Sequence, residues 1–385
     1  MKNIKRLALL SLSLFSLIST NVSYAKENSK EENISDYILE PMPSWYSERF
    51  TRGHLDISKM LKNGYTRLEA VEVQNQMKDL LDSNPVFQEL ENNNEAYSMF
   101  KSKDPYVLQA LKMAIKSVKE NKYIESGFKL EPLKDDEFYV AFDLDETLLV
   151  QWYESGEKGS KYYDIKTNVQ DNILKPTLKS PTYVSLTPGF EKALKDIASI
   201  PNNKGIIFFS AKLDTATYAI IDSMKIDGKP MRTFLKGVFT RNHLIRDQEP
   251  PKLSKDLRII DETLKHIIII DDNPSRILDK QKKNLKEIPK YNPDEYMKAK
   301  ETGNKSISDY YEKVLPTIVN EIKESAEYAR KNKTSFVEAY YPYTMDSSAE
   351  LLMYITQGLT YKEAISRVRK DHKLFEPKFY FYEDK

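Results

Sequence analysis

Three short apolar runs in the middle of the chain predict the strands of a buried sheet. The first run covers residues 138–142, with aromatic and β-branched members and no turn residue. Residues 205–209 and the four isoleucines at 267–270 form the other two, and residues 183–186 and 237–241 give weaker strand patterns. Continuous apolar runs of this length are typical of strands that are buried on both faces of a parallel sheet. We therefore expect an α/β fold built on a parallel sheet.

Apolar residues recur at helical spacing on both sides of the expected sheet. Thr66 and Glu69 can form a capping box at the start of one helix, and Asp104 precedes Pro105 at the start of another. The low glycine count, 11 in 385 residues, agrees with many helices around a modest sheet. Helices are expected at residues 66–81, 104–121, 190–200, 215–224, 306–331, 347–357 and 360–371.

These patterns divide the chain into a core and two extensions. We assign residues 26–135 to a helical N-terminal extension, 136–290 to the core and 291–385 to a helical C-terminal extension. Within the core, residues 151–182 are polar, rich in tyrosine and without helical periodicity. Because this segment directly follows the first strand, we expect it to form a small flap over the end of that strand.

The first 25 residues carry the pattern of an export signal. A basic start precedes an apolar stretch over residues 7–18, and Ser23 and Ala25 place small side chains where a signal peptidase reads them. The apolar stretch is too short to span a bilayer comfortably, so we expect no stable membrane insertion after signal cleavage, with an uncleaved anchor as the lesser alternative. The signal predicts a bacterial protein that is exported to the periplasm or secreted.

The rest of the composition excludes several kinds of site. The chain has no cysteine, which rules out a disulfide framework, a thiolate nucleophile and a cysteine-based zinc site. The 59 basic and 58 acidic residues nearly balance, and removal of the signal leaves 56 basic residues. A chain this close to neutral does not favour a nucleic-acid partner.

Paired aspartates follow two of the expected strands. Asp143 and Asp145 come directly after the first run, and Asp271 and Asp272 follow the isoleucines, where Pro274 forces a turn. The carboxyl ends of parallel strands meet at one edge of a sheet, which is where open α/β folds place their ligands. Neighbouring carboxylates repel one another unless a cation lies between them, and Mg²⁺ takes such oxygen ligands. The four aspartates therefore predict one magnesium site.

Two further residues are candidates for the same edge of the sheet. Ser210 ends the second run, where it can either cap the next helix or donate a hydrogen bond to a phosphoryl oxygen. Lys255 lies in the loop before the isoleucine run, and a lysine in a chain this rich in lysine is usually solvated. The residues alone leave both alternatives open.

The order of these motifs resembles the haloacid-dehalogenase (HAD) superfamily, and within it the NLI-interacting-factor-like or polymerase carboxy-terminal-domain phosphatases. The resemblance covers about residues 138–276. Ser210 stands where many relatives have threonine, and Lys212 stands where a small residue is usual. The expected export signal is foreign to the nuclear members, so their polymerase-tail substrate is not carried over. The motifs are DLDETL (143–148), TPG (187–189), YA (218–219), TR (240–241), KDL (255–257) and DDNP (271–274).

The resemblance implies a HAD-like Rossmannoid sheet and a catalytic role for several residues. Asp143 would be the nucleophile that forms an aspartyl-phosphate, and Asp145 the general acid and base. Mg²⁺ would be held by Asp143, the Asp145 backbone carbonyl and Asp272, with Asp271 behind them. Ser210 and Lys255 would stabilise charge on the phosphoryl oxygens. The implied substrate-binding residues are Thr147, Ala211 and Arg241.

These inferences favour a Mg²⁺-dependent phosphatase that hydrolyses phosphomonoesters. The alternatives are a secreted phosphoprotein phosphatase, a phosphotransferase, and a catalytically silent binding module that keeps the fold. The last is disfavoured because a silent module has no reason to keep the whole set of motif residues. The expected partner is a phosphorylated small molecule or a phosphoprotein.

Overall fold

The computed structural model describes residues 33–38, 55–85, 104–153, 162–169, 180–247 and 252–371. The expected export signal, residues 1–25, lies outside this part of the chain. Among the residues described, no helix has both the length and the apolar character needed to cross a lipid bilayer.

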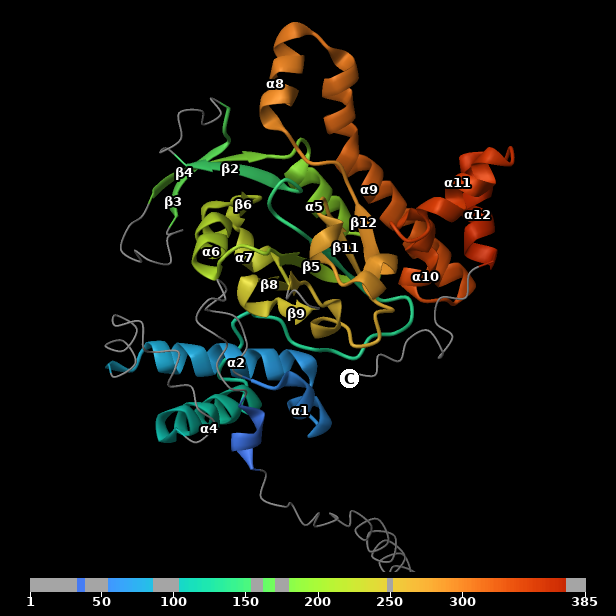
Figure 1. Ribbon diagram of the computed structural model, residues 1–385. Helices are drawn as coiled ribbons and strands as arrows, with labels where there is room; N and C mark the ends of the chain where they lie inside the picture. The colour runs from blue at the N-terminus through green and yellow to red at the C-terminus, as the bar shows by residue number, and fades with distance from the viewer. Residues whose placement is uncertain are drawn as a thin grey trace, which may run out of the picture.

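A five-stranded parallel sheet forms the centre of the fold, as the apolar runs predicted (Figure 1). Its strand order is β12-β11-β1-β5-β8. Phe142 lies opposite both Ile270 and Phe208, so the central three strands end at nearly the same level. The strands are β1 (Phe138–Phe142), β5 (Asn203–Phe209), β8 (Gly237–Phe239), β11 (Ile267–Asp271) and β12 (Leu285–Glu287).

Side chains of β1 alternate between two apolar clusters, one on each face of the sheet. Phe138, Val140 and Phe142 belong to one cluster, and Tyr139 and Ala141 to the other. All five are buried, which explains why the strand is an unbroken apolar run. The first face is covered by α5 (Phe190–Ala198), α6 (Asp214–Ser223) and part of the C-terminal helices.

The N-terminal helices lie against the opposite face, where α2 is shared between two cores (Figure 1). Leu68 and Val71 of α2 join the sheet cluster, whereas Val73 and Met77 pack with α4. The capping box of Thr66 with Glu69 is confirmed, as is Asp104 as the N-cap of α4. The elements are η1 (Ile34–Tyr37), α1 (Ile57–Lys62), α2 (Arg67–Asp82) and α4 (Pro105–Lys119).

The expected flap forms a small antiparallel sheet together with the predicted strand at residues 183–186, which is confirmed as the end of β4, whereas β2 and β3 were not predicted. Its strands are β2 (Leu149–Tyr153), β3 (Ile165–Val169) and β4 (Ser180–Leu186), in the order β2-β4-β3. The strands are short, and in β3 exposed positions alternate with less exposed ones. They therefore lack the continuous apolar run that marks the central sheet. The loops between them, residues 154–161 and 170–179, lie outside the described residues.

Short elements connect the central strands. The expected strand at 237–241 ends at Phe239, because the side chain of Thr240 caps a 3₁₀ helix that begins at Arg241. The connecting elements are β6 (Lys225–Ile226), β7 (Lys229–Pro230), α7 (Met231–Phe234), η3 (Arg241–His243), β9 (Ile245–Asp247), β10 (Lys252–Ser254), η4 (Leu257–Ile259), η5 (Pro274–Arg276) and η6 (Asp279–Asn284).

The C-terminal helices begin earlier than the sequence pattern indicated. Besides the expected helices, the lysine-rich segment after residue 276 forms the edge strand β12 and the helix α8, neither of which has a clear apolar period. The helices are α8 (Pro293–Thr302), α9 (Lys305–Asn332), α10 (Phe336–Tyr340), η7 (Tyr341–Tyr343), α11 (Ser348–Thr356) and α12 (Tyr361–Asp371).

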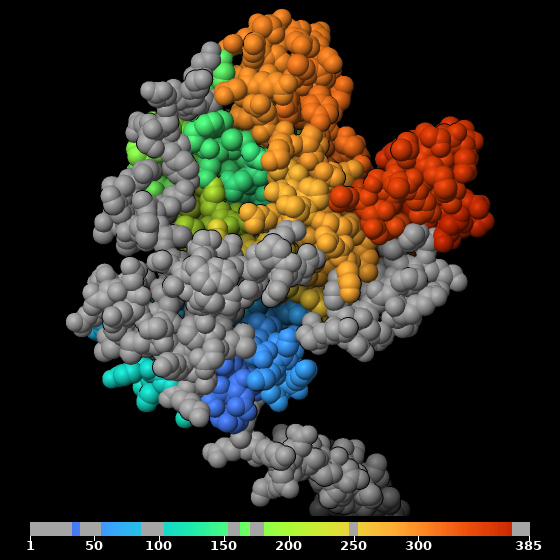
Figure 2. All heavy atoms as spheres, viewed as in Figure 1, coloured from blue at the N-terminus to red at the C-terminus, as the bar shows by residue number. Residues whose placement is uncertain are grey.

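Three of these helices, α9, α10 and α12, contribute residues to the same core as the sheet. Leu315 and Ile318 of α9 join the first apolar cluster, and Phe336 of α10 stacks on Phe138 of β1 with ring centroids 3.7 Å apart. The domain boundary at residue 290 stays a prediction, but packing does not stop there. Ile365 of α12 also joins this cluster, although α11 and α12 form a lobe at one side of the molecule (Figure 2).

Candidate active site

Three buried carboxylates meet at the carboxyl ends of β1 and β11. Asp143 follows β1 directly, Asp271 is the last residue of β11, and Asp272 comes next. The backbone N–H of Asp143 donates to the carbonyl of Ile270 at 2.9 Å, which continues the strand pairing into the site. Oxygen atoms of the three carboxylates lie within 4.8 Å of one another. We call Asp143, Asp271 and Asp272 the strand-end carboxylates.

Lys255 bridges two of the strand-end carboxylates. Its Nζ lies 2.6 Å from Oδ1 of Asp143 and 2.7 Å from Oδ2 of Asp271. The side chain is almost fully buried, and the backbone N–H of Lys255 donates to the carbonyl of Arg276 at 2.7 Å. Lys255 is therefore a site residue and not one of the solvated lysines of the chain.

Burial and charge act against each other in this group. Burial by itself lowers the pKa of Lys255, but the adjacent Asp143 and Asp271 outweigh it and raise that pKa. Burial raises the pKa of Asp143. Lys255 opposes this shift, whereas the charges of Asp271 and Asp145 add to it. Lys255 lies between two of the three carboxylates, and the only other ammonium group near them among the described residues is the exposed Lys290, 3.7 Å from Asp272, so the site favours a further cation.

Thr147 holds the third strand-end carboxylate in place. Its hydroxyl donates to Oδ1 of Asp272 at 2.8 Å and accepts from the Asp272 backbone N–H at 3.0 Å. Burial raises the pKa of Asp272, and the hydrogen bond from Thr147 opposes that shift. Thr147 is fully buried, so the structure gives it contact with a strand-end carboxylate where the resemblance implied contact with substrate.

A cavity of about 260 Å³ opens above the strand-end carboxylates. We call it the carboxylate cavity. Asp145 lies at its wall, where Oδ1 accepts from Nζ of Lys212 at 2.8 Å. Lys290 does not line the cavity, but it pairs with the cavity residue Glu146 and lies 3.7 Å from Oδ2 of Asp272. The lining residues are Asp143, Asp145, Glu146, Ala211, Lys212, Lys255, Asp271, Asp272, Asn273 and Arg276.

The sequence analysis assigned no role to two of these cations. Lys212 stood out only as an unusual residue at its position in the motif, and its pairing with Asp145 depends on how the loops after β1 and β5 face each other. Lys290 carried no signal, because nothing near it in the sequence marks it as a neighbour of Glu146.

Of the other expected site residues, only Ala211 lines the carboxylate cavity. Ser210 is fully buried, and its hydroxyl accepts from the backbone N–H of Lys212 at 3.1 Å. This contact shapes the turn after β5, which is close to the capping alternative. Arg241 begins η3, and its backbone N–H donates to the carbonyl of Lys212 at 2.9 Å. The side chain of Arg241 is not among those that line the cavity.

The strand-end carboxylates fit a divalent metal. They offer oxygen atoms only, which suits a hard cation, and the buried arrangement keeps several negative charges together. Asp143 and Asp272 face the carboxylate cavity, whereas both oxygens of Asp271 already accept hydrogen bonds, from Lys255 and from the Asn273 backbone N–H at 2.8 Å. Asp143 and Asp272 are therefore better placed than Asp271 to hold a metal directly.

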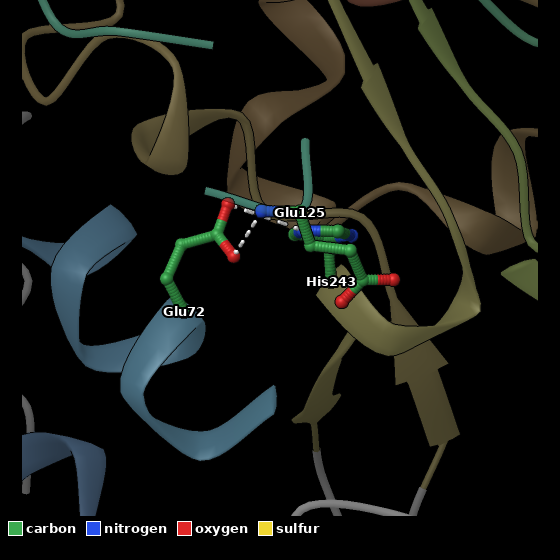
Figure 3. A group of neighbouring side chains, drawn as sticks. All are labelled: Glu72, Glu125 and His243. Carbon is green, nitrogen blue, oxygen red and sulfur yellow. Dashed lines mark hydrogen bonds and ion pairs between the residues drawn. The ribbon is translucent and has the colours of Figure 1, made fainter. Parts of the chain in front are cut away.

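A second group of metal-ligand residues, Glu72, Glu125 and His243, joins α2 to the core (Figure 3). We call it the Glu72 cluster. Glu72 accepts hydrogen bonds from the Glu125 backbone N–H at 3.0 Å, the Ser126 backbone N–H at 3.2 Å and the Ser126 hydroxyl at 2.7 Å. Nε2 of His243 lies 3.6 Å from Oε1 of Glu72. The contacts fasten α2 to the loop that follows β8.

The tautomer of His243 argues against a metal in the Glu72 cluster. Its Nδ1 accepts from the backbone N–H of Thr240 at 3.1 Å, so the proton of the neutral ring is on Nε2. Nε2 is the nitrogen that faces Glu72, and a protonated nitrogen has no lone pair for a metal. This cluster was not predicted, because its members are far apart in the chain.

A larger groove of about 630 Å³ runs beside the carboxylate cavity. Its walls come from the flap sheet, the start of α5 and the start of α8, and include Tyr162, Tyr163, Tyr291 and Tyr296. The backbone N–H of Tyr291 donates to the carbonyl of Glu146, a cavity residue, at 2.7 Å. The two hollows are therefore neighbours.

Comparison with known proteins agrees with the chemistry of this site. The family model of NLI interacting factor-like phosphatases matches residues 138–322. A structure of the fission yeast RNA polymerase II CTD phosphatase Fcp1, as a variant bound to beryllium fluoride, has 16% identity, covers 62% of this chain and 68% of its own, and has a TM-score of 0.32. A second structure, described as Fcp1, an essential RNA polymerase II CTD phosphatase, has the same identity and coverage and a TM-score of 0.31. The comparison with curated proteins found no match. The segment from residue 138 to residue 322 is thus similar to the NLI interacting factor-like phosphatases.

Proposed function

We propose that the protein is a Mg²⁺-dependent phosphatase that hydrolyses phosphomonoesters through an aspartyl-phosphate on Asp143. The observation that carries this proposal is the bridge from Lys255 to Asp143 and Asp271 at the floor of the carboxylate cavity. A lysine that orients one carboxylate, beside further carboxylates that suit a metal, is what a phosphoryl acceptor at this position needs.

In the first step, an oxygen of Asp143 attacks phosphorus and the bond from phosphorus to the ester oxygen breaks. Lys255 holds the Asp143 carboxylate in place through a hydrogen bond of 2.6 Å. Asp145 gives its proton to the departing oxygen, so the first product leaves as an alcohol. Its side chain is about one third exposed at the cavity wall, where it can reach a leaving group.

In the second step, water attacks phosphorus and the bond to Asp143 breaks. Asp145 takes the proton from this water, and phosphate leaves. The nucleophilic carboxylate and the acid are thereby regenerated. Transfer to an alcohol in place of water would make the enzyme a phosphotransferase, and the carboxylate cavity is compatible with either acceptor.

Asp143, Asp272 and the backbone of Asp145 would hold Mg²⁺ at this site. When bound, the metal would neutralise charge on the phosphoryl oxygens and on the neighbouring carboxylates. Thr147 would contribute indirectly, since its two hydrogen bonds fix the orientation of Asp272.

A phosphoprotein is the second candidate substrate. The groove beside the carboxylate cavity favours it, because a polypeptide that places its phosphorylated residue in the cavity could continue along the tyrosines of the groove. Turnover of phosphopeptides compared with nucleotides and sugar phosphates would distinguish this substrate from small esters. The export pattern at residues 1–25 supports a periplasmic or secreted location, which fractionation of the bacterial host would test.

Hydrolysis of p-nitrophenyl phosphate by the chain without its first 25 residues tests the proposal. We expect turnover with Mg²⁺, loss of turnover with EDTA, and recovery when excess Mg²⁺ is added. Added glycerol would become phosphorylated if the protein is a transferase. A folded protein that binds Mg²⁺ but hydrolyses none of p-nitrophenyl phosphate, nucleotides, sugar phosphates or phosphopeptides would overturn the proposal in favour of a binding module.

A further inference from the structure

Nearly every cation around the carboxylate cavity is already paired with a carboxylate. Lys255 binds Asp143 and Asp271, and Lys212 binds Asp145. Lys290, at the edge of the cavity, pairs with Glu146. Each of these ammonium groups must leave a partner, or share it, before it can bind a substrate.

Arg276 is different. It lines the same cavity, yet its guanidinium has no hydrogen-bond or ion-pair partner among the residues that the structure describes. The side chain is only partly buried, so the guanidinium keeps its water shell until a ligand displaces it. An unpaired guanidinium at the rim of an acidic cavity is available to an anion without the loss of an existing contact.

The backbone of Arg276 is held firmly although its head group is free. Its N–H donates to the carbonyl of Asn273 at 3.0 Å, and its carbonyl accepts from the Lys255 N–H at 2.7 Å. The side chain of Asn273 accepts from the Ser275 N–H at 3.2 Å and from the Ser275 hydroxyl at 2.6 Å, which closes the turn after Pro274. The base of the Arg276 side chain is therefore fixed relative to Lys255 and the strand-end carboxylates.

Sheet order also places Arg276 and Lys212 on opposite sides of the nucleophile. Arg276 follows β11 and Lys212 follows β5, and these strands flank β1, which carries Asp143 at its end. A phosphoryl group in line with Asp143 would thus lie between the two loops. Lys212 is occupied by Asp145, so Arg276 is the unpaired cation on the other side among the cavity residues that the structure describes.

We propose that Arg276 binds the phosphoryl group of the substrate through its guanidinium. This inference rests on the proposed function, and it gives Arg276 the role that the family resemblance assigned to Arg241. A guanidinium presents two parallel N–H groups that match two phosphoryl oxygens, which an ammonium group cannot do. Arg241 does not line the cavity and already takes part in other interactions, and Ser210 is buried with its hydroxyl engaged.

The test compares four arginine variants for phosphate binding and turnover. Arg276→Met removes the guanidinium, and Arg276→Lys keeps the charge but loses the paired N–H groups. Arg241→Met tests the alternative arginine. Arg367→Met is the matched control. Arg367 lies on α12, pairs with Asp371 on the same helix and does not line the carboxylate cavity. Thermal unfolding confirms that each variant is folded.

Binding of inorganic phosphate in the presence of Mg²⁺ is measured by titration calorimetry, which does not depend on turnover. We expect Arg276→Met to weaken phosphate binding about tenfold to hundredfold, as for loss of charge-assisted hydrogen bonds. Arg276→Lys should lie between this variant and the wild type, and Arg367→Met should match the wild type. The KM for p-nitrophenyl phosphate should rise in the same order.

Two outcomes would overturn the inference: phosphate binding unchanged in Arg276→Met, or a larger loss in Arg241→Met than in Arg276→Met. Failure of the proposed function looks different. In that case the wild type would hydrolyse no phosphate ester, while the calorimetric comparison of the variants would still decide whether Arg276 binds the anion.

Discussion

The strand-end carboxylates and the Glu72 cluster are made of the same kinds of side chain, yet they serve opposite purposes. Glu72 is surrounded by donors: two backbone N–H groups and the Ser126 hydroxyl satisfy its oxygens. Asp143 has one ammonium group, which it shares with Asp271, and it faces a cavity. The oxygens of Glu72 are satisfied by these donors, whereas the strand-end carboxylates retain charge and access for a ligand.

The difference shows that composition alone does not identify a functional site. A buried carboxylate that is saturated by fixed dipoles stabilises the fold, because its charge is solvated by the protein. A buried carboxylate cluster with too few cations stores unfavourable charge and favours binding of a cation or reaction with an electrophile. Variants in the two groups should therefore affect different quantities.

The largest effect is expected from Asp143→Asn, which removes the nucleophile. The amide oxygen can still accept from Lys255, so the fold should be retained, while kcat for p-nitrophenyl phosphate should fall by about 10⁴-fold or more. Steady-state assays and thermal unfolding of the same preparation measure both. Asp222→Asn, which changes an exposed aspartate that pairs with Arg232, is the control. Turnover close to that of the wild type would contradict the nucleophile assignment.

A somewhat smaller loss of activity is expected from Asp145→Asn. The asparagine cannot protonate the leaving oxygen, so phosphorylated enzyme should form about 10²–10⁴-fold more slowly. Rapid-quench measurement of labelled protein follows this step directly. If the variant is phosphorylated at the wild-type rate, another group supplies the proton.

In the other group, Glu72→Gln should destabilise the fold and leave the chemistry intact. The amide can accept fewer of the three hydrogen bonds, so the free energy of unfolding should fall by about 1–3 kcal/mol. Denaturant unfolding measures this change, and Glu120→Gln at an exposed site is the control. A large fall in kcat for the folded variant, with stability unchanged, would contradict the structural role of the Glu72 cluster.

The pH dependence of the stability difference between the wild type and Glu72→Gln gives a sharper test. Burial raises the pKa of Glu72, but the nearby His243 and the hydrogen bonds from Ser126 outweigh it, so the pKa lies below its ordinary value of 4.5. A lowered folded-state pKa means that the ionised carboxylate adds stability above pH 4.5, and that this stability is lost as the pH falls through the folded-state pKa. The stability gap between the wild type and Glu72→Gln should thus be full near neutral pH and shrink below pH 4.5. A gap that widens on acidification would contradict this sign.

The smallest effect is expected from Thr147→Val. Valine keeps the shape of threonine but loses both hydrogen bonds to Asp272. Loss of such a supporting contact should weaken Mg²⁺ affinity by about tenfold, with a smaller change in turnover at saturating Mg²⁺. The Mg²⁺ dependence of p-nitrophenyl phosphate hydrolysis measures it. Unchanged Mg²⁺ dependence would show that Asp272 does not rely on Thr147.

Elements with local causes could be predicted from the amino-acid sequence. The central strands were predictable because burial on both faces requires a continuous apolar run, as in β1 and β11. The start of α2 was predictable because the capping box of Thr66 and Glu69 involves residues three apart. The positions of Asp143 and Asp271 at strand ends followed from the same runs.

Which of these residues come into contact depends on how the whole chain folds. Lys255 reaches Asp143 across 112 positions of the chain, and Glu72 reaches Ser126 across 54. The loop after β11 places Arg276 at the carboxylate cavity, whereas the loop after β8 leaves Arg241 outside it. Such pairings depend on strand order, register and loop path, which are set by packing of the whole core. The residues that neighbour each partner in the sequence therefore do not predict these pairings.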